Sequence, residues 1–167
     1  MPEIDQLLAA NRDYAAGWTP HVTNARPARR LAVVTCMDAR IDVFAALGLA
    51  LGDSHVIRNA GGRVTEDVVR SLALSSHVLG VDTVVVMQHT KCGLTGVTDE
   101  ELREITGADV GFLPIADHVA ALKEDIETLA AKPYLEPIKT IAGLVYDVET
   151  GAVDDVIRWE RSLKTPS

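Results

Sequence analysis

The chain has 167 residues, 47% of them apolar and 24% charged, which is the balance of a globular protein that closes its own hydrophobic core. Its formal net charge of −8 argues against binding to nucleic acids or to anionic membranes, because both repel an acidic surface. The N-terminus has neither the basic start nor the apolar stretch of a signal peptide, so we expect a cytoplasmic protein with a single domain over residues 1–167.

The first predicted element is an N-terminal helix. Apolar side chains recur there at helical spacing, from Ile4 and Leu8 to Trp18, and Gly17 and Pro20 interrupt the pattern. An amphipathic helix of this kind needs a surface to cover, either on its own domain or on a partner subunit.

Strands and helices then alternate along the middle of the chain. Short apolar runs rich in β-branched residues predict buried strands over residues 31–35, 55–58 and 83–88. Longer apolar patterns predict helices between them, over residues 41–51 and 64–79. This alternation predicts an α/β fold with a mostly parallel central sheet flanked by helices.

Two further helices and a hairpin complete the predicted fold. Thr98 and Glu101 form a capping-box pattern that opens one helix, and residues 119–129 have the pattern of a second, amphipathic helix. Residues 141–148 and 152–157 flank a short turn, which predicts a hairpin with an antiparallel C-terminal strand.

Two clusters of chemically active residues follow predicted strands. Cys36, Asp38 and Arg40 come after the first strand, and His89 and Cys92 come after the third. In an α/β sheet the functional site lies beyond the carboxyl ends of the strands, so we expect the two thiols and the imidazole to meet there. Two cysteines and one histidine suit tetrahedral zinc, and three protein ligands leave the fourth position open, as at a catalytic zinc.

The two clusters resemble the motifs of the β-class carbonic anhydrases, and the likeness extends over most of the chain. The residues that carry it are Cys36, Asp38, Arg40, His89, Cys92, Gly93 and the loop Arg58-Asn59-Ala60-Gly61. The resemblance implies a zinc enzyme, with one ion per subunit, that reversibly hydrates carbon dioxide to bicarbonate and a proton through zinc-bound hydroxide. It also implies a homodimer, alone or paired into a tetramer, in which the N-terminal helix packs on the partner subunit.

The resemblance also implies roles for individual residues. Cys36, His89 and Cys92 are implied as the zinc ligands, and Asp38 and Arg40 as the catalytic pair. Asp38 would join the zinc as a fourth ligand only in a closed state, at lower pH, and Arg40 would stabilise the open state. The implied pocket residues are Asn59, Ala60, Gly61 and Gly93.

Some positions depart from the family pattern. Met37 and Ala39 stand where members often have serine, and Gly62 stands where they often have a polar residue. Val33 replaces the tryptophan that some bacterial members have beside an inhibitory bicarbonate pocket, which counts against such a regulatory site here. None of these changes touches a predicted zinc ligand, and glycine at positions 61 and 62 lets the backbone approach the site closely.

The residue chemistry predicts how the site responds to pH. Two thiolates and a neutral imidazole cancel the charge of zinc, so we expect its water to ionise at higher pH than at a three-histidine site, with activity rising into mildly alkaline conditions. Asp38, beside Arg40, stays ionised and can accept a proton from the nucleophile. The histidines that could pass protons to the buffer are His21, His55, His77 and His118.

Three other functions stay open from the sequence. The same zinc scaffold could hydrolyse carbonyl sulfide or carbon disulfide. A thiol enzyme could use Cys36 as nucleophile and His89 as base, although Arg40 lies too close to Cys36 in sequence for a phosphatase-type loop. A non-catalytic zinc-binding module would use Asp38 as a permanent fourth ligand.

Overall fold

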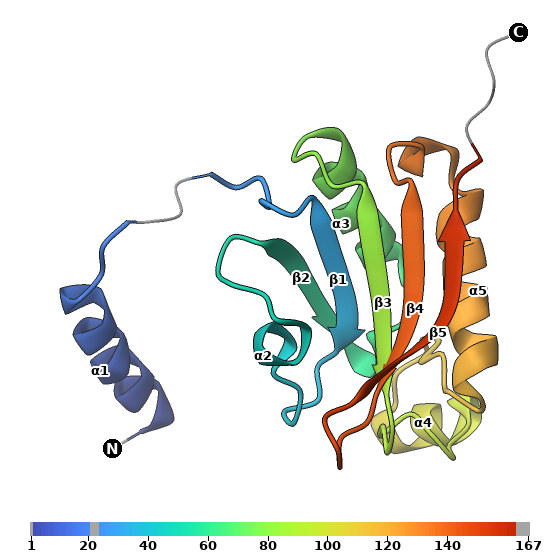
Figure 1. Ribbon diagram of the computed structural model, residues 1–167. Helices are drawn as coiled ribbons and strands as arrows, with labels where there is room; N and C mark the ends of the chain where they lie inside the picture. Colours follow the sequence, from blue (N-terminus) through green and yellow to red (C-terminus); the bar gives the residue numbers. More distant parts are fainter. Residues whose placement is uncertain (1, 21–23, 163–167) are drawn as a thin grey trace, which may run out of the picture.

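The computed structural model describes residues 2–20 and 24–162, and its centre is a sheet of five strands in the order β2-β1-β3-β4-β5 (Figure 1). β1 pairs in parallel with both β2 and β3, β3 pairs in parallel with β4, and β5 is antiparallel to β4. The predicted mostly parallel α/β sheet and its C-terminal hairpin strand are therefore confirmed. The strands are β1 Leu31–Cys36, β2 Ser54–Asn59, β3 Thr83–His89, β4 Thr140–Tyr146 and β5 Val153–Glu160.

Helices flank this sheet. α3 and α5 lie behind it in Figure 1, α2 lies near the β2 edge, and α1 stands apart. The predicted capping box begins α4: the Glu101 amide donates to Thr98 Oγ1 at 3.2 Å, and the Thr98 amide donates to Glu101 Oε2 at 2.8 Å. The helices are α1 Glu3–Ala16, α2 Val43–Leu47, α3 Glu66–His77, α4 Asp99–Thr106 and α5 His118–Ala131, with 3₁₀ turns η1 Ala60–Gly62 and η2 Pro133–Leu135.

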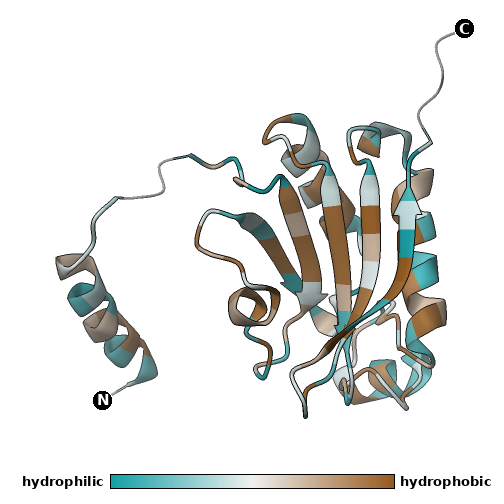
Figure 2. Ribbon diagram, viewed as in Figure 1, coloured by the Kyte–Doolittle hydropathy of each residue, from teal (hydrophilic) through white to brown (hydrophobic). Residues whose placement is uncertain are grey.

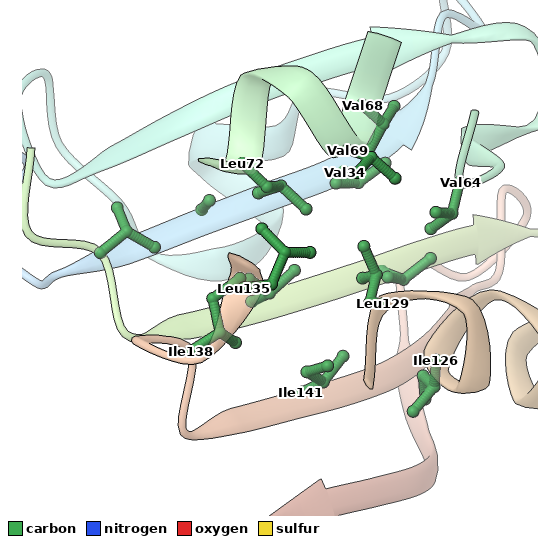
Figure 3. Packing of buried hydrophobic residues seen from close by; sticks show 14 of the residues in the cluster. Val34, Val64, Val68, Val69, Leu72, Ile126, Leu129, Leu135, Ile138 and Ile141 are labelled. Carbon is green, nitrogen blue, oxygen red and sulfur yellow. The ribbon is translucent and has the colours of Figure 1, made fainter. Parts of the chain in front are cut away.

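Apolar side chains pack on both faces of the sheet. One cluster lies between the sheet and helices α3 and α5, where Val34, Leu72, Leu129 and Ile141 are buried (Figure 3). The second cluster includes Met87 and reaches the carboxyl ends of β1 and β3. Figure 2 shows how strongly the apolar residues concentrate in the central strands. Burial on both faces explains why these strands appear in the sequence as continuous apolar runs.

The helix expected over residues 41–51 is shorter than predicted. α2 comprises only Val43–Leu47, because Asp42 caps its start by accepting a hydrogen bond from the Ala45 amide, and Gly48 ends it with a φ of 61°. Beyond it, Leu51 exposes 56% of its surface. The apolar composition of this stretch was therefore misleading, and the two cap residues determine the length of the helix.

The predicted N-terminal helix is confirmed as α1, and it lies outside both apolar clusters. None of its residues is buried, and Ile4, Leu7, Leu8 and Tyr14 expose 52–64% of their surface. Its apolar face thus stays uncovered within the described chain (Figure 1). No helix in residues 2–20 and 24–162 combines the length and the apolar character needed to cross a membrane.

The turn after β2 packs directly on the ends of β1 and β3. Gly61 and Gly62 adopt left-handed conformations, with φ of 73° and 65°. A Cβ atom at Gly62 would lie 2.8 Å from the Cys36 amide nitrogen and 3.0 Å from the Met87 carbonyl oxygen, so a larger residue would displace a strand. The predicted close backbone approach is confirmed at Gly62, whereas a Cβ atom at Gly61 would meet side chains, the nearest being Leu94 Cδ1 at 2.7 Å.

We expect Gly62→Ala to lower the free energy of unfolding by about 1–3 kcal/mol more than the control Gly80→Ala, because overpacking adds to the backbone cost. Both glycines have a positive φ, 65° and 79°, but only at Gly62 would the new Cβ meet other atoms within 4 Å. Equilibrium unfolding in urea measures the difference. Equal losses would mean that the strand ends relax to make room.

Candidate metal centre

Three potential metal ligands meet at the carboxyl ends of β1 and β3. Cys36 is the last residue of β1, His89 is the last residue of β3, and Cys92 lies just beyond it. Their ligand atoms lie within 4.8 Å of one another, and all three residues are buried. The strand order explains the meeting, because the chain passes from β2 across β1 to β3, and such a switch point opens a crevice at the carboxyl ends.

His89 is oriented to offer a lone pair to this cluster. Its Nδ1 lies 2.9 Å from the Thr90 carbonyl oxygen, which can only accept, so Nδ1 carries the proton and Nε2 does not. Nε2 is buried and has no hydrogen-bond partner within the described chain. A buried acceptor without a partner is costly, and a bound metal ion would remove that cost.

The protonation of the cluster also fits a metal site. Burial lowers the pKa of His89, which keeps the imidazole neutral and able to bind a cation. Burial, with a smaller effect from the neighbouring Cys36, raises the pKa of the Cys92 thiol. Adjacent buried thiols ionise readily only when a cation compensates their charge. Two sulfurs and one imidazole nitrogen are a donor set that suits zinc, so the residues fit the ion that the sequence predicts.

Asp38 and Arg40 form a tightly held pair beside the cluster. Arg40 donates from Nε and Nη2 to the two carboxylate oxygens, at 2.9 and 2.7 Å, and from its backbone amide to Oδ1 at 2.9 Å. These bonds hold the pKa of Asp38 well below its usual range. Asp38 Oδ2 lies 3.7 Å from His89 Nε2, so an ionised carboxylate adjoins the potential ligands.

Two arginines brace the loops that carry these residues. Arg58, on β2, donates to the carbonyl oxygens of Cys36 and Asp38 at 2.9 and 2.7 Å, and to a third carbonyl of the same loop at 3.3 Å. Arg40 Nη2 donates to the Lys91 carbonyl oxygen at 3.0 Å, which ties the two motifs together. The sequence linked Arg58 to the pocket only through the family likeness, because its partners lie in a different segment.

An open cavity of about 380 Å³ adjoins the cluster. Of the predicted pocket residues, Ala60, Gly61 and Gly93 line it, whereas the side chain of Asn59 binds the backbone of Arg63. The apolar residues of the wall were missed from the sequence, because single apolar residues in loops form no recognisable pattern there. The remaining lining residues are Cys36, Met37, Asp38, Cys92, Leu94 and Phe112.

Three of the four histidines considered for proton transfer hold hydrogen bonds and are not among the residues that line this cavity. Both ring nitrogens of His55 hold hydrogen bonds of 2.9 Å, and His77 Nε2 holds one of 2.7 Å to a carbonyl oxygen. His118 Nδ1 lies 2.9 Å from Gln88 Oε1, and burial lowers its pKa. None of the three lines the cavity, and His21 is outside the described residues.

Known proteins are similar to this chain in both sequence and fold. A family model described as carbonic anhydrase matches residues 31–133. Beta-carbonic anhydrase 1 of Mycobacterium tuberculosis is 36% identical over 162 residues, which cover 93% of this chain and 99% of that protein. The chain belongs to the β-carbonic anhydrase family.

Structures of other β-carbonic anhydrase family members confirm the fold. Carbonic anhydrase from Streptococcus mutans superposes with a TM-score of 0.83 at 42% identity, over 94% of this chain and 99% of that one. Carbon disulfide hydrolase of Saccharolobus solfataricus is 30% identical over 177 residues, covering 88% of this chain and 85% of that enzyme. Membership of the β-carbonic anhydrase family therefore leaves the substrate to be argued from the site itself.

Zinc affinity should fall by about tenfold or more for each pH unit between about pH 8 and about pH 6, because zinc must displace the proton of the Cys92 thiol. The raised pKa of Cys92 keeps that proton bound throughout this range in the metal-free protein. His89 adds little to the slope, because its lowered pKa already leaves it neutral. Competition with a chelator of known affinity measures the slope, and an affinity independent of pH would mean that the thiols do not bind the ion.

Proposed function

We propose that this protein reversibly hydrates carbon dioxide to bicarbonate and a proton, with one zinc ion per subunit. The observation that carries the proposal is the buried Nε2 of His89, which has no hydrogen-bond partner in the described chain and lies beside two thiols. Both thiols line an open cavity, so an ion held there would be accessible to a small substrate. Three protein ligands are the number that a catalytic zinc site uses.

In this proposal Cys36, His89 and Cys92 would hold the zinc, which would supply a Lewis acid and make hydroxide available near neutral pH. Asp38 is ionised and adjoins the ligands, so it can accept a hydrogen bond from the attacking water and orient it. Arg40 keeps the carboxylate in that orientation through its paired hydrogen bonds. We propose that this pairing marks the active state, and that Asp38 would become a fourth ligand only in a closed state.

The pocket wall suits carbon dioxide, which is small and apolar. Ala60, Gly61 and Gly93, together with Leu94 and Phe112, offer mainly apolar surface next to the proposed zinc ligands. Such a wall excludes competing water without requiring polar contacts to the substrate. Asp38 and the ligands then supply the polar groups that the reaction needs.

Hydrolysis of carbonyl sulfide or carbon disulfide is the second candidate. Both are linear apolar molecules that the same wall would accept, and a carbon disulfide hydrolase is a relative at 30% identity. The higher identity to carbonic anhydrases over nearly their whole length, 36% and 42%, favours carbon dioxide. Release of sulfide from carbon disulfide faster than hydration of carbon dioxide would reverse this preference.

The two remaining alternatives fit the geometry less well. A thiol nucleophile needs a base that takes its proton, but His89 Nε2 accepts no hydrogen bond from the thiol of Cys36 or any other group within the described chain. A closed, non-catalytic zinc site needs Asp38 as a ligand, but both of its carboxylate oxygens are bound by Arg40.

We also propose that the chain acts as a single domain in the cytoplasm. The family match and the aligned relative together span most of its length. Both cysteines are free, and thiols kept as metal ligands suit a reducing compartment.

Zinc analysis combined with stopped-flow hydration of carbon dioxide tests the proposed reaction. We expect about one zinc per wild-type chain, and Cys92→Ser should lose most of both zinc and activity. Asp38→Asn should keep its zinc while kcat/KM falls about 10- to 100-fold, because the water loses its acceptor but the ion keeps its ligands. A zinc-loaded wild type without hydration activity would leave a binding module as the better interpretation.

The assembly we propose is a homodimer, alone or paired into a tetramer, in which α1 packs on the partner subunit. Ile4, Leu7 and Leu8 expose 64%, 57% and 52% of their surface on one side of α1. An apolar helix face without a cover is unfavourable in water, and the described chain provides no cover for it.

We expect the double substitution Ile4→Glu/Leu8→Glu to raise the dimer dissociation constant by about 100-fold or more, because it would bury charges in an apolar contact. Ile105→Glu is the control, since Ile105 lies on α4 with 78% of its surface exposed. Light scattering across a dilution series measures both. If the double variant dissociates no more readily than the wild type across the dilution series, α1 is not at the interface.

A further inference from the structure

One buried arginine outside the two motifs connects two parts of the chain that line the cavity, η1 and the segment that contains Phe112, to helix α5. Arg63 follows η1 directly, and only 2% of its surface is exposed. Its Nε donates to Asp125 Oδ2 on α5 at 2.8 Å, and its Nη2 donates to Glu124 Oε2 at 2.8 Å. Its Nη1 donates to the carbonyl oxygen of Leu113 at 2.7 Å. The side chain thus joins η1, α5 and the irregular segment before α5.

The bond to Leu113 holds an unfavourable backbone conformation. Leu113 has a φ of 55°, in the left-handed region that side chains with a Cβ atom avoid. Two further hydrogen bonds anchor the residues beside it: the Phe112 amide donates to Asp99 Oδ1 at 2.7 Å, and the Ile115 amide donates to the Leu94 carbonyl at 2.8 Å. Residues 112–115, of which Phe112 lines the cavity, are therefore held in place by contacts from several elements.

This pinning matters because Phe112 and Leu94 line the cavity together with Cys36 and Cys92. We propose that Arg63 is a positioning residue: through Leu113 it holds Phe112 in the entrance wall and so limits the size of the molecules that reach the thiols. Its consequence for catalysis rests on the function proposed above, but the positioning itself can be measured without any metal.

The chemistry of the buried pair favours positioning over simple stabilisation. Arg63 and Asp125 are both 2% exposed, and a buried ion pair is often no more stable than apolar residues in its place. What an apolar pair would not supply is the fork of donors that reaches Asp125 and Leu113 at once. Apolar replacement should therefore preserve folding while it releases residues 112–115.

The test uses Arg63→Met/Asp125→Asn in the metal-free protein. This pair leaves no buried unpaired charge, because Glu124, which also loses its bond to Arg63, has a side chain that is 66% exposed. The Asn oxygen can still accept from the Val64 amide, which donates to Asp125 Oδ1 at 3.1 Å. We expect the hydrogen-exchange protection of the Phe112 and Ile115 amides to fall about tenfold or more, with β1 and β3 unchanged. The rate of cysteine labelling by a pyrene maleimide relative to iodoacetamide should rise by a similar factor, because the bulky reagent gains most from a loosened wall.

Further variants distinguish the role of Phe112 in the cavity wall from the role of Arg63 in holding it. They also replace the double variant if that variant fails to fold. Arg63→Lys keeps a charge for Asp125 but loses the fork, and it should change both readouts in the same direction by a smaller factor. Phe112→Ala should raise the labelling ratio while the Ile115 amide stays protected. The control Asp67→Leu/Arg70→Met removes an exposed ion pair on α3 and should change neither readout.

The proposal is overturned if a folded Arg63 variant keeps both the protection and the labelling ratio within about twofold of the wild type. Neither readout depends on zinc or on carbon dioxide, so absence of hydration activity would refute the proposed function and leave this result intact. Conversely, an active enzyme with unchanged labelling in Arg63→Lys would refute the positioning role alone.

Discussion

Parallel pairing of β1 with β3 is the constraint on which the candidate site depends. The two strands run in register from Leu31 opposite Thr83 to Thr35 opposite Met87, and Thr35 Oγ1 donates to the Met87 carbonyl oxygen at 2.8 Å. Because Cys36 and His89 are the last residues of these two strands, a slip of one residue would shift one of them along the sheet by about 3.3 Å relative to the other. The observed register of β1 and β3 therefore sets the distance between a thiol and an imidazole.

The same local arrangement, a left-handed residue held by an arginine, occurs on two sides of the cavity. Lys91 and Leu113 both have a left-handed backbone, with φ of 54° and 55°, and the carbonyl oxygen of each accepts a hydrogen bond from an arginine. Arg40 holds Lys91, between His89 and Cys92, and Arg63 holds Leu113, next to Phe112 in the cavity wall. A charged donor with several N–H groups can stabilise an unfavourable loop conformation and contact a carboxylate at the same time. Irregular segments around the site thereby gain the rigidity that helices and strands have from their own hydrogen bonds.

Charge balance links the two motifs. Without a cation the buried cluster tends to neutrality, since burial lowers the pKa of His89 and raises that of Cys92. A divalent ion would be compensated by two thiolates, while the carboxylate of Asp38 is already compensated by Arg40. The carboxylate therefore needs no metal to remain ionised beside the cluster, which leaves it available to act on a substrate or on water.

The sequence by itself determined the fold class, the order of the elements and the residues of the candidate metal centre. Apolar periodicity depends on local geometry, and cysteine and histidine at the ends of predicted parallel strands must lie at one edge of the sheet. Apolar composition predicted helix length poorly where cap residues set the ends of the helix. At α2, for example, Gly48 ends the helix although the apolar stretch continues. Only the tertiary structure decided that Asn59 turns away from the cavity, that Phe112 and Leu94 form its wall, and that Arg63 joins residues 50 or more positions apart in the chain. Those contacts arise from packing between distant segments, and no pattern within a short stretch of sequence encodes them.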